Sequence, residues 1–149
     1  MRPDRIDNRQ AHDILESRKD AVYIDVRTEE EFNAGHPEGA VNIPIGVPNP
    51  MMQRFDVNPD FVDVVRASWP ENTTLLVGCR TGPRAEMAAQ LLAQKGYMKV
   101  SWVLGGFAGI TDPAGNVVAP GWQQLGYPES REPREGASYP ALRKKAGKA

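Results

Sequence analysis

The chain contains 149 residues, of which 40% are hydrophobic and 25% charged, a size and composition typical of one globular domain. Its 18 basic and 19 acidic residues leave a formal charge of -1, which gives no reason to expect nucleic acid or an anionic membrane as a partner. The single cysteine excludes an internal disulfide, and His12 and His36 stand apart from it. We therefore expect neither a zinc site nor any other metal or cofactor.

The N-terminal third alternates between helical and strand patterns. Residues 8–18 are predicted to form a helix, with Asn8 at its N-cap and apolar residues at helical spacing. The apolar run at 22–26 is typical of a strand buried on both faces. Thr28 and Glu31 have the spacing of a capping box, so this strand is expected to lead directly into a short helix.

The middle of the chain repeats this alternation after an irregular stretch. Residues 40–45 are predicted to form a strand, and the segment 46–59, with three prolines, an irregular connection. A helix is expected from about residue 60, because Asn58 and Pro59 suit its N-cap and first turn.

Two more strands flank the most strongly indicated helix, which covers residues 84–96 and ends at a glycine. These strands are expected at 73–78 and 97–104. Such alternation predicts an α/β fold with an open parallel sheet covered on both faces, in which ligands bind beyond the carboxyl ends of the strands.

The signals weaken after Gly106. A closing segment is expected to pack Trp122, so that the domain spans residues 1–128. Residues 129–149 carry prolines and many charges, and we expect a flexible tail without a core of its own. The four basic residues near its end suggest a solvated tail or, as the alternative, a binding segment.

Cys79 stands at the end of one predicted strand, directly before a tight loop and a helix N-terminus. This geometry aims several backbone N–H groups at one point and would hold an anion there. Lone cysteines are often small buried residues. The neighbouring Arg80 and Arg84 favour instead a reactive thiolate at the floor of the loop. The N–H groups available to this cradle are those of residues 80, 81, 82, 84 and 85, because Pro83 has none.

Three motifs in this order resemble the rhodanese family, specifically its single-domain members. They are YIDVRTEEEFNAGHPEGAVNIP, CRTGPRA and VLGGF, within a match that covers about residues 6–128. The resemblance implies a doubly wound fold with a five-stranded parallel sheet, and a sulfurtransferase whose cysteine carries a persulfide. By position, Cys79 is the sulfur carrier, Asp25 and Arg27 are structural supports, and the rest of the active-site loop is Arg80, Thr81, Gly82, Pro83 and Arg84.

Loop length separates this family from related enzymes. The loop from Cys79 to Arg84 has six residues, the rhodanese length, whereas related cell-cycle phosphatases and arsenate reductases use a loop one residue longer. A longer loop surrounds a tetrahedral oxyanion, while the shorter one fits a single sulfur atom. Sulfur transfer is therefore favoured, and a phosphatase or arsenate reductase is the weaker alternative.

The resemblance implies a donor such as thiosulfate or mercaptopyruvate, oriented by Arg80 and Arg84, and an acceptor that is cyanide, a thiol or a partner protein. A second hypothesis is a slow or non-catalytic sulfur-relay or regulatory module. No nucleic acid or membrane partner is expected. The N-terminus lacks a signal-peptide pattern and no segment is apolar enough to span a membrane, so a cytoplasmic location is expected.

The chain departs from the family pattern in two places. GHPEGA replaces the commoner GHIPGA, and His36 within it is expected to be structural rather than catalytic. In the family a tryptophan commonly follows within a few residues of VLGGF. This chain has Ile110 at about that position and a tryptophan only at Trp122, which indicates an insertion at about 107–121. This insertion is either a surface excursion or a partial lid or specificity element.

Overall fold

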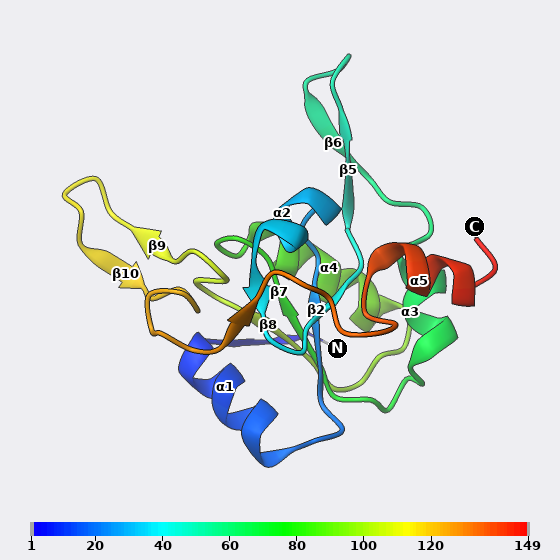
Figure 1. Cartoon of the computed structure of the whole chain (residues 1–149), viewed down its shortest axis with the longest axis horizontal. Helices are drawn as coiled ribbons and strands as arrows, with labels where there is room; N and C mark the ends of the chain where they lie inside the picture. The colour runs from blue at the N-terminus through cyan, green and yellow to red at the C-terminus, as the bar shows by residue number, and fades with distance from the viewer. Residues whose placement is uncertain (1, 149) are drawn as a thin grey trace.

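A five-stranded parallel sheet forms the centre of the protein (Figure 1). The structure, a computed structural model, describes residues 2–148. Its strands follow the order β1-β8-β7-β2-β4, and every pair of neighbours is parallel. The bounds are β1 (Asp4–Ile6), β2 (Val22–Asp25), β4 (Val41–Asn42), β7 (Leu75–Gly78) and β8 (Val100–Val103). The predicted α/β fold with a five-stranded parallel sheet is confirmed.

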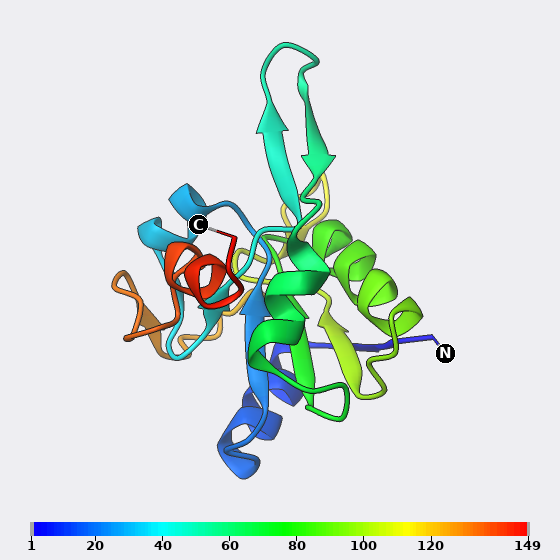
Figure 2. The ribbon, with the colours of Figure 1, turned by 90° about the vertical axis from the view of Figure 1, so that its right-hand side faces the viewer.

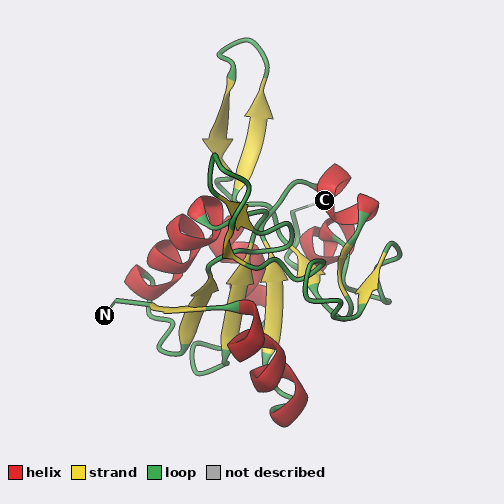
Figure 3. Ribbon diagram, turned by 90° about the vertical axis from the view of Figure 1, so that its left-hand side faces the viewer, coloured by secondary structure: helices red, strands yellow, loops and turns green. Residues whose placement is uncertain are grey.

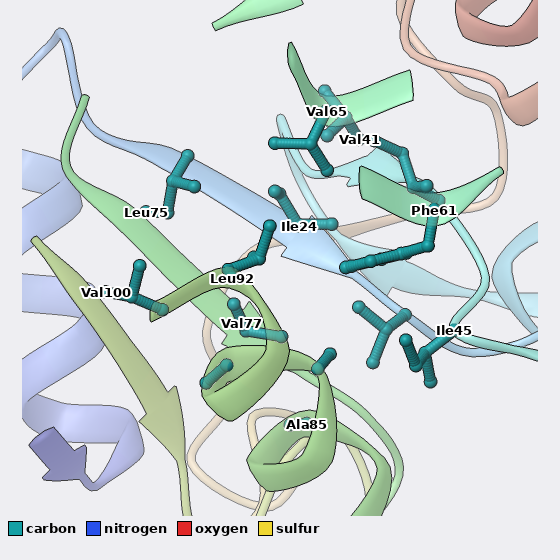
Figure 4. Close-up of a cluster of buried hydrophobic side chains, with 14 of the residues drawn as sticks. Ile24, Val41, Ile45, Phe61, Val65, Leu75, Val77, Ala85, Leu92 and Val100 are labelled. Carbon is teal, nitrogen blue, oxygen red and sulfur yellow. The ribbon is translucent and has the colours of Figure 1, made fainter. Parts of the chain in front are cut away.

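Helices cover both faces of this sheet, as expected (Figures 1 and 2). One face packs against α1 (Asn8–Ser17) and α2 (Glu29–Ala34), and the other against α3 (Phe61–Ser68), α4 (Pro83–Gln94) and α5 (Tyr139–Lys145). Because side chains alternate along a strand, Tyr23 and Leu76 point to the first face. Ile24 and Val77 point to the second, where Figure 4 shows them with Leu92 of α4. The apolar side chains of β2 and β7 thus pack into two separate hydrophobic clusters, one on each face of the sheet.

Two elements of the sheet differ from the sequence-based expectation. The edge strand β1 was not foreseen, because its three residues DRI are largely exposed and too short and polar to show a pattern. It pairs with β8, where Arg5 lies opposite Trp102. At the other edge, the strand expected at 40–45 is reduced to the two residues of β4, although the N–H groups of Ile43 and Ile45 still donate to the carbonyls of Asp25 and Val26.

The segment expected to be irregular, 46–59, is an antiparallel hairpin. It consists of β5 (Gly46–Asn49) and β6 (Arg54–Val57), and it projects from the body of the domain (Figure 2). In Figure 3 it extends from the end of the molecule toward which the central strands point. Each strand of a two-stranded ribbon is hydrogen-bonded along one edge only, so Pro48, which has no backbone N–H, is tolerated in β5. Five apolar side chains of this hairpin are exposed: Val47, Met51, Met52, Phe55 and Val57.

The segment 107–121 contains a second, smaller hairpin of β9 (Ile110–Thr111) and β10 (Val117–Ala119). Asp112 shapes its turn, because its carboxylate accepts hydrogen bonds from the backbone N–H groups of Ala114 and Asn116. After the hairpin, Trp122 is buried and its indole N–H donates to the Pro128 carbonyl at 2.7 Å. The expected packing of Trp122 is confirmed.

Residues 129–148 differ from the expected tail without a core. β11 (Glu129–Ser130) pairs with β3 (His36–Pro37), and α5 packs on α3. Ala137, Tyr139 and Leu142 are buried in the main hydrophobic cluster. Ser138 caps the helix by accepting a hydrogen bond from the Ala141 N–H. The high density of charges concealed this short amphipathic helix in the sequence, so the boundary expected at residue 128 does not separate the tail from the domain core.

Candidate active site

Cys79 directly follows β7, at the carboxyl edge of the sheet and before the first turn of α4. The residue is only 2% exposed, so its side chain is buried. The preceding carbonyl, that of Gly78, accepts a hydrogen bond from the Val26 N–H at 2.9 Å. The start of the loop is therefore tied to the end of the neighbouring strand β2.

Residues 105–108, which begin with the double glycine Gly105–Gly106, form backbone hydrogen bonds to the carbonyl groups of the loop. Cys79, Arg80 and Thr81 accept hydrogen bonds from the backbone N–H groups of residues 107, 108 and 105, at 2.9, 2.9 and 2.7 Å. With the carbonyls turned outward, the N–H groups of residues 80–82 donate to no acceptor within the described chain. The first helical bond of α4 begins only at Glu86, which donates to Gly82. Such N–H groups without an acceptor, placed directly before a helix, are available to an anion, and the anion cradle stays a prediction.

The three hydrogen bonds from residues 105, 107 and 108 to the loop, called the clamp below, require glycine at position 106. Gly106 has φ +52°, and a Cβ placed on it would overlap the carbonyl oxygens of Cys79 and Arg80. The Gly106 carbonyl accepts hydrogen bonds from the Asn8 side chain at 2.7 Å and from the backbone N–H of Trp122 at 2.9 Å. Asn8 also donates to the Pro120 carbonyl, so α1 and the segment 106–122 together fix the back of the loop.

Arg84, at the end of the loop, forms a bidentate ion pair with Glu31 of α2. The two N···O distances are 2.7 and 3.1 Å. Burial disfavours the Glu31 carboxylate, but hydrogen bonds from Arg84 and from Thr28 lower its pKa to about 2. The hydrogen bond to Glu31 raises the pKa of Arg84 in turn. Arg84 therefore anchors the loop to α2, whereas the sequence-based expectation gave it a part in orienting the donor.

Asp25, the last residue of β2, forms a buried ion pair with Arg27. The Arg27 guanidinium donates to both carboxylate oxygens, with distances from 2.7 to 3.1 Å, and also to the Gly35 carbonyl at 2.6 Å. Its Cζ lies 4.6 Å from the ring centroid of Phe107, whose backbone N–H donates to the Cys79 carbonyl. Although burial opposes it, the contact with Asp25 raises the pKa of Arg27. The pair thus reaches the loop through Phe107, and the role of Asp25 and Arg27 as structural supports stays a prediction.

Arg80 differs from the other two arginines. It is exposed and takes part in none of the ion pairs found among residues 2–148. Together with Thr81, Gly82 and Pro83 it lines a cavity of about 650 Å³ beside the loop. Ile110 and Thr111 line the same cavity, which brings the base of the β9–β10 hairpin to the site.

His36 is buried and lies outside the loop. Its ring stacks on Phe32 with centroids 3.7 Å apart, and its Nδ1–H donates to the Phe32 carbonyl at 2.7 Å. These contacts join α2 to β3 and are consistent with the structural role expected of this histidine.

Three residues that hold the loop or its supports in place were not identified as such from the sequence. Asn8 was interpreted as an N-cap, but Asp7 caps α1 and the Asn8 side chain is used for the clamp. Phe107 appeared only as part of a motif, and Glu31 only as part of a capping box. The capping box is confirmed, yet one residue serves both the box and Arg84. Only the second contact depends on tertiary packing.

Within residues 2–148, no helix has the length and apolarity needed to cross a membrane. In the same range, no three or more His, Cys, Asp and Glu side chains are grouped in a way that could hold a metal ion.

Comparisons with known proteins agree with this geometry. The family model described as a rhodanese-like domain matches residues 7–112. Thiosulfate sulfurtransferase 18 of Arabidopsis thaliana is 38% identical over 72% of this chain and 77% of its own length. The chloroplastic thiosulfate sulfurtransferase 16 of the same plant is 36% identical over 66% of this chain and 78% of its own. The crystal structure of Rv0390 from M. tuberculosis superposes with a TM-score of 0.73 at 27% identity, covering 89% of this chain and all of that one. The chain belongs to the rhodanese-like domain family.

Proposed function

We propose that this protein is a single-domain sulfurtransferase that carries sulfur as a persulfide on Cys79. The observation that carries the proposal is the six-residue loop, which begins at the buried Cys79 and whose N–H groups at residues 80–82 have no acceptor within the described chain. A cradle of this kind stabilises the extra negative charge of a persulfide by hydrogen bonds that need no rearrangement during the reaction. The relatives named thiosulfate sulfurtransferase support the same activity.

The reaction takes two steps. The Cys79 thiolate attacks the outer sulfur of thiosulfate, the S–S bond breaks, and sulfite leaves with its electron pair. An external nucleophile, such as cyanide, a small thiol or a protein thiol, then attacks the terminal sulfur and releases the Cys79 thiolate. Discharge is intermolecular, because the chain has no second cysteine to resolve the persulfide.

Arg80 is the residue that meets the donor. It is exposed at the rim of the loop and has no carboxylate partner within the described residues, so its charge is free for a small oxyanion or carboxylate. Arg84 acts through the loop instead, since Glu31 holds its guanidinium. Thr81, Gly82 and Pro83 form the remaining wall of the cradle. Neither a cofactor nor a metal enters the proposed reaction.

Intact-mass spectrometry tests the proposal. Incubation with thiosulfate or mercaptopyruvate should add about 32 Da, the mass of one sulfur atom, and subsequent cyanide should remove it. Cys79→Ser should show neither the adduct nor sulfur transfer. Wild-type protein that keeps its original mass with both donors would overturn the proposal.

A second candidate is a relay module that receives its sulfur from, or delivers it to, another protein. The observation that favours it is the β5–β6 hairpin, which exposes Met51 and Met52 while Phe55 lies 5.8 Å from the Arg84 guanidinium. Exposed apolar side chains on a hairpin whose Phe55 lies beside the loop are suited to protein contact. The double variant Met51→Ser/Met52→Ser should slow loading from a persulfide-bearing protein but leave thiosulfate kinetics unchanged. Equal loading rates in variant and wild type would exclude this role.

The partners and the location follow from the same proposal. We propose small sulfur donors and thiol, cyanide or protein acceptors, with no nucleic acid or membrane partner, and a cytoplasmic location. Cell fractionation with antibody detection tests the location, and recovery in an organelle or membrane fraction would contradict it.

A further inference from the structure

The β5–β6 hairpin has a strand edge that no other strand of the described chain covers. Within residues 2–148, β6 pairs with β5 alone, and the hairpin extends away from the helices and the central sheet (Figures 2 and 3). A free edge presents unpaired backbone N–H and C=O groups, with which a strand of another chain can pair. Pairing at this edge is independent of the proposed sulfur transfer.

Hydrogen bonding at the base of the hairpin determines which backbone groups of β6 point outward. The Asn58 N–H donates to the Ile45 carbonyl at 2.7 Å. Because hydrogen-bonded and non-hydrogen-bonded pairs alternate along an antiparallel ladder, Asp56 bonds to β5 through its backbone, whereas Phe55 does not. The residue opposite Phe55 is Pro48, which has no N–H to donate. The N–H and C=O groups of Phe55 therefore point toward the free edge.

The side chains of β6 place opposite charges on either side of Phe55. Arg54 and Asp56 share one face of the hairpin, where the Arg54 Nε donates to one Asp56 oxygen at 2.9 Å and Asn49 donates to the other at 2.8 Å. Both charged side chains are about half exposed, and the terminal nitrogens of Arg54 have no partner within the described residues. Phe55 is on the opposite face and is 54% exposed. The charges and the aromatic ring are therefore accessible to a second strand.

A second copy of β6 fits this edge in antiparallel orientation about a two-fold axis. With the axis at Phe55, the two Phe55 residues form a hydrogen-bonded pair, because both direct their N–H and C=O groups outward. Arg54 of each copy is then opposite Asp56 of the other, in a non-hydrogen-bonded pair, where side chains lie closest. With the axis at Asp56, two carboxylates would instead lie opposite each other, which is destabilising. Charge complementarity therefore selects the register centred on Phe55.

We propose that the free edge of β6 pairs with the β6 edge of a second copy of this chain, so that two hairpins form one four-stranded antiparallel sheet. Two backbone hydrogen bonds between the Phe55 residues, two Arg54–Asp56 ion pairs and the contact between the Phe55 rings stabilise this dimer. Because β6 has only four residues, the association is reversible and depends on protein concentration.

Sedimentation velocity measures the association at protein concentrations up to about 1 mM. As the concentration rises, the mass of the wild-type protein should change from that of one chain to twice that value. Arg54→Glu places like charges opposite each other and should raise the dissociation constant at least about tenfold. Arg9→Glu is the matched control, because it makes the same charge change on an exposed residue of α1, and it should associate like wild type.

A double variant tests the register. Arg54→Glu/Asp56→Lys exchanges the two charges, so the variant keeps an opposite pair both within the hairpin and across the dimer. It should associate with itself as tightly as wild type does. In a mixture with wild type, like charges would lie opposite each other, so native mass spectrometry should detect few mixed dimers. Free mixing of the two proteins would overturn the inference.

Amide hydrogen exchange followed by NMR tests whether the dimer uses this edge. The Phe55 N–H should exchange slowly in concentrated protein and rapidly in dilute protein, because only the dimer gives it an acceptor. The Asp56 N–H, which bonds to β5, is the internal control and should exchange at the same rate in both. A chain that keeps the mass of one copy at about 1 mM would overturn the inference.

Two other results would also overturn it. One is a dimer in which the Phe55 N–H still exchanges rapidly, because its interface would lie elsewhere. The other is a monomeric chain whose Phe55 N–H is protected by a different protein, because the edge would then belong to that partner. None of these measurements involves sulfur loading of Cys79, so the proposed sulfurtransferase activity stands or falls separately.

Discussion

Replacing Gly106 with alanine should release the clamp on the active-site loop. Two effects add. A non-glycine residue at φ +52° costs about 1 to 2 kcal/mol of conformational strain. The new Cβ also overlaps the Cys79 and Arg80 carbonyl oxygens, so the segment must move away from the loop.

That movement breaks the two hydrogen bonds of 2.9 Å that Phe107 and Ala108 donate to these carbonyls. At about 1 kcal/mol each, their loss brings the total destabilisation to about 3 to 4 kcal/mol. Because the carbonyls then turn freely, the N–H groups of the cradle lose their common direction. We expect Cys79 to load sulfur from thiosulfate at least tenfold more slowly in Gly106→Ala, a loss of about 1.4 kcal/mol in transition-state stabilisation.

Urea denaturation and the rate of persulfide formation measure the two effects. Gly115→Ala is the matched control, because Gly115 has φ +87° but a Cβ there meets nothing within 4 Å. It carries the conformational strain without the overlap. The two variants should therefore differ by about 2 kcal/mol, or roughly 4 to 8 °C in Tm, and Gly115→Ala should load sulfur at the wild-type rate. If both variants lose the same stability and load sulfur equally fast, the clamp does not hold the loop.

Two further predictions concern the supports around the loop. The pKa of Glu31 is lowered, so its contribution to stability is present above about pH 4.5 and is lost as the pH falls toward 2. The side chains of Arg84 and Glu31 are 23% and 29% exposed, so solvent screens their ion pair. We expect Glu31→Gln to lower the free energy of unfolding by about 1 to 2 kcal/mol in urea titrations at pH 7, and by less as the pH approaches 2. An equal loss at both pH values would contradict this. Leu142→Ala should cost about 2 to 5 kcal/mol, because Leu142 is buried in the core. In the same thermal-unfolding assay the exposed Lys144→Ala should be nearly neutral, and an equally neutral Leu142→Ala would show that α5 does not support the domain.

Local patterns were sufficient for the central elements and for the place of the proposed nucleophile, Cys79. The apolar runs at β2 and β7 predict buried strands, because only a strand covered on both faces accepts side chains that are apolar on both sides. The glycine-containing turn after β7 placed Cys79 at a strand end before a helix, where N–H groups converge. These features depend on a few neighbouring residues, so the sequence displays them directly.

The short and polar elements were not predictable in this way. β1 becomes a strand only because the edge of β8 supplies its hydrogen-bond partners. The hairpin at 46–57 was hidden by its prolines, and α5 by its charges, because Tyr139 and Leu142 are too few to mark an apolar face until α3 lies beside them. Their conformation is decided by partners far away in the chain.

The candidate site divides along the same line. The amino-acid sequence by itself determined the loop length, the single cysteine, the positions of the arginines, and hence the kind of chemistry proposed. Only the tertiary structure separated the arginines, because Glu31 reaches Arg84 from α2 while no carboxylate in the described chain reaches Arg80. It also brought Gly105, Phe107 and Ala108 behind the loop. Such contacts join residues up to about a hundred positions apart, and they exist only after packing has fixed which strand ends and helix ends meet.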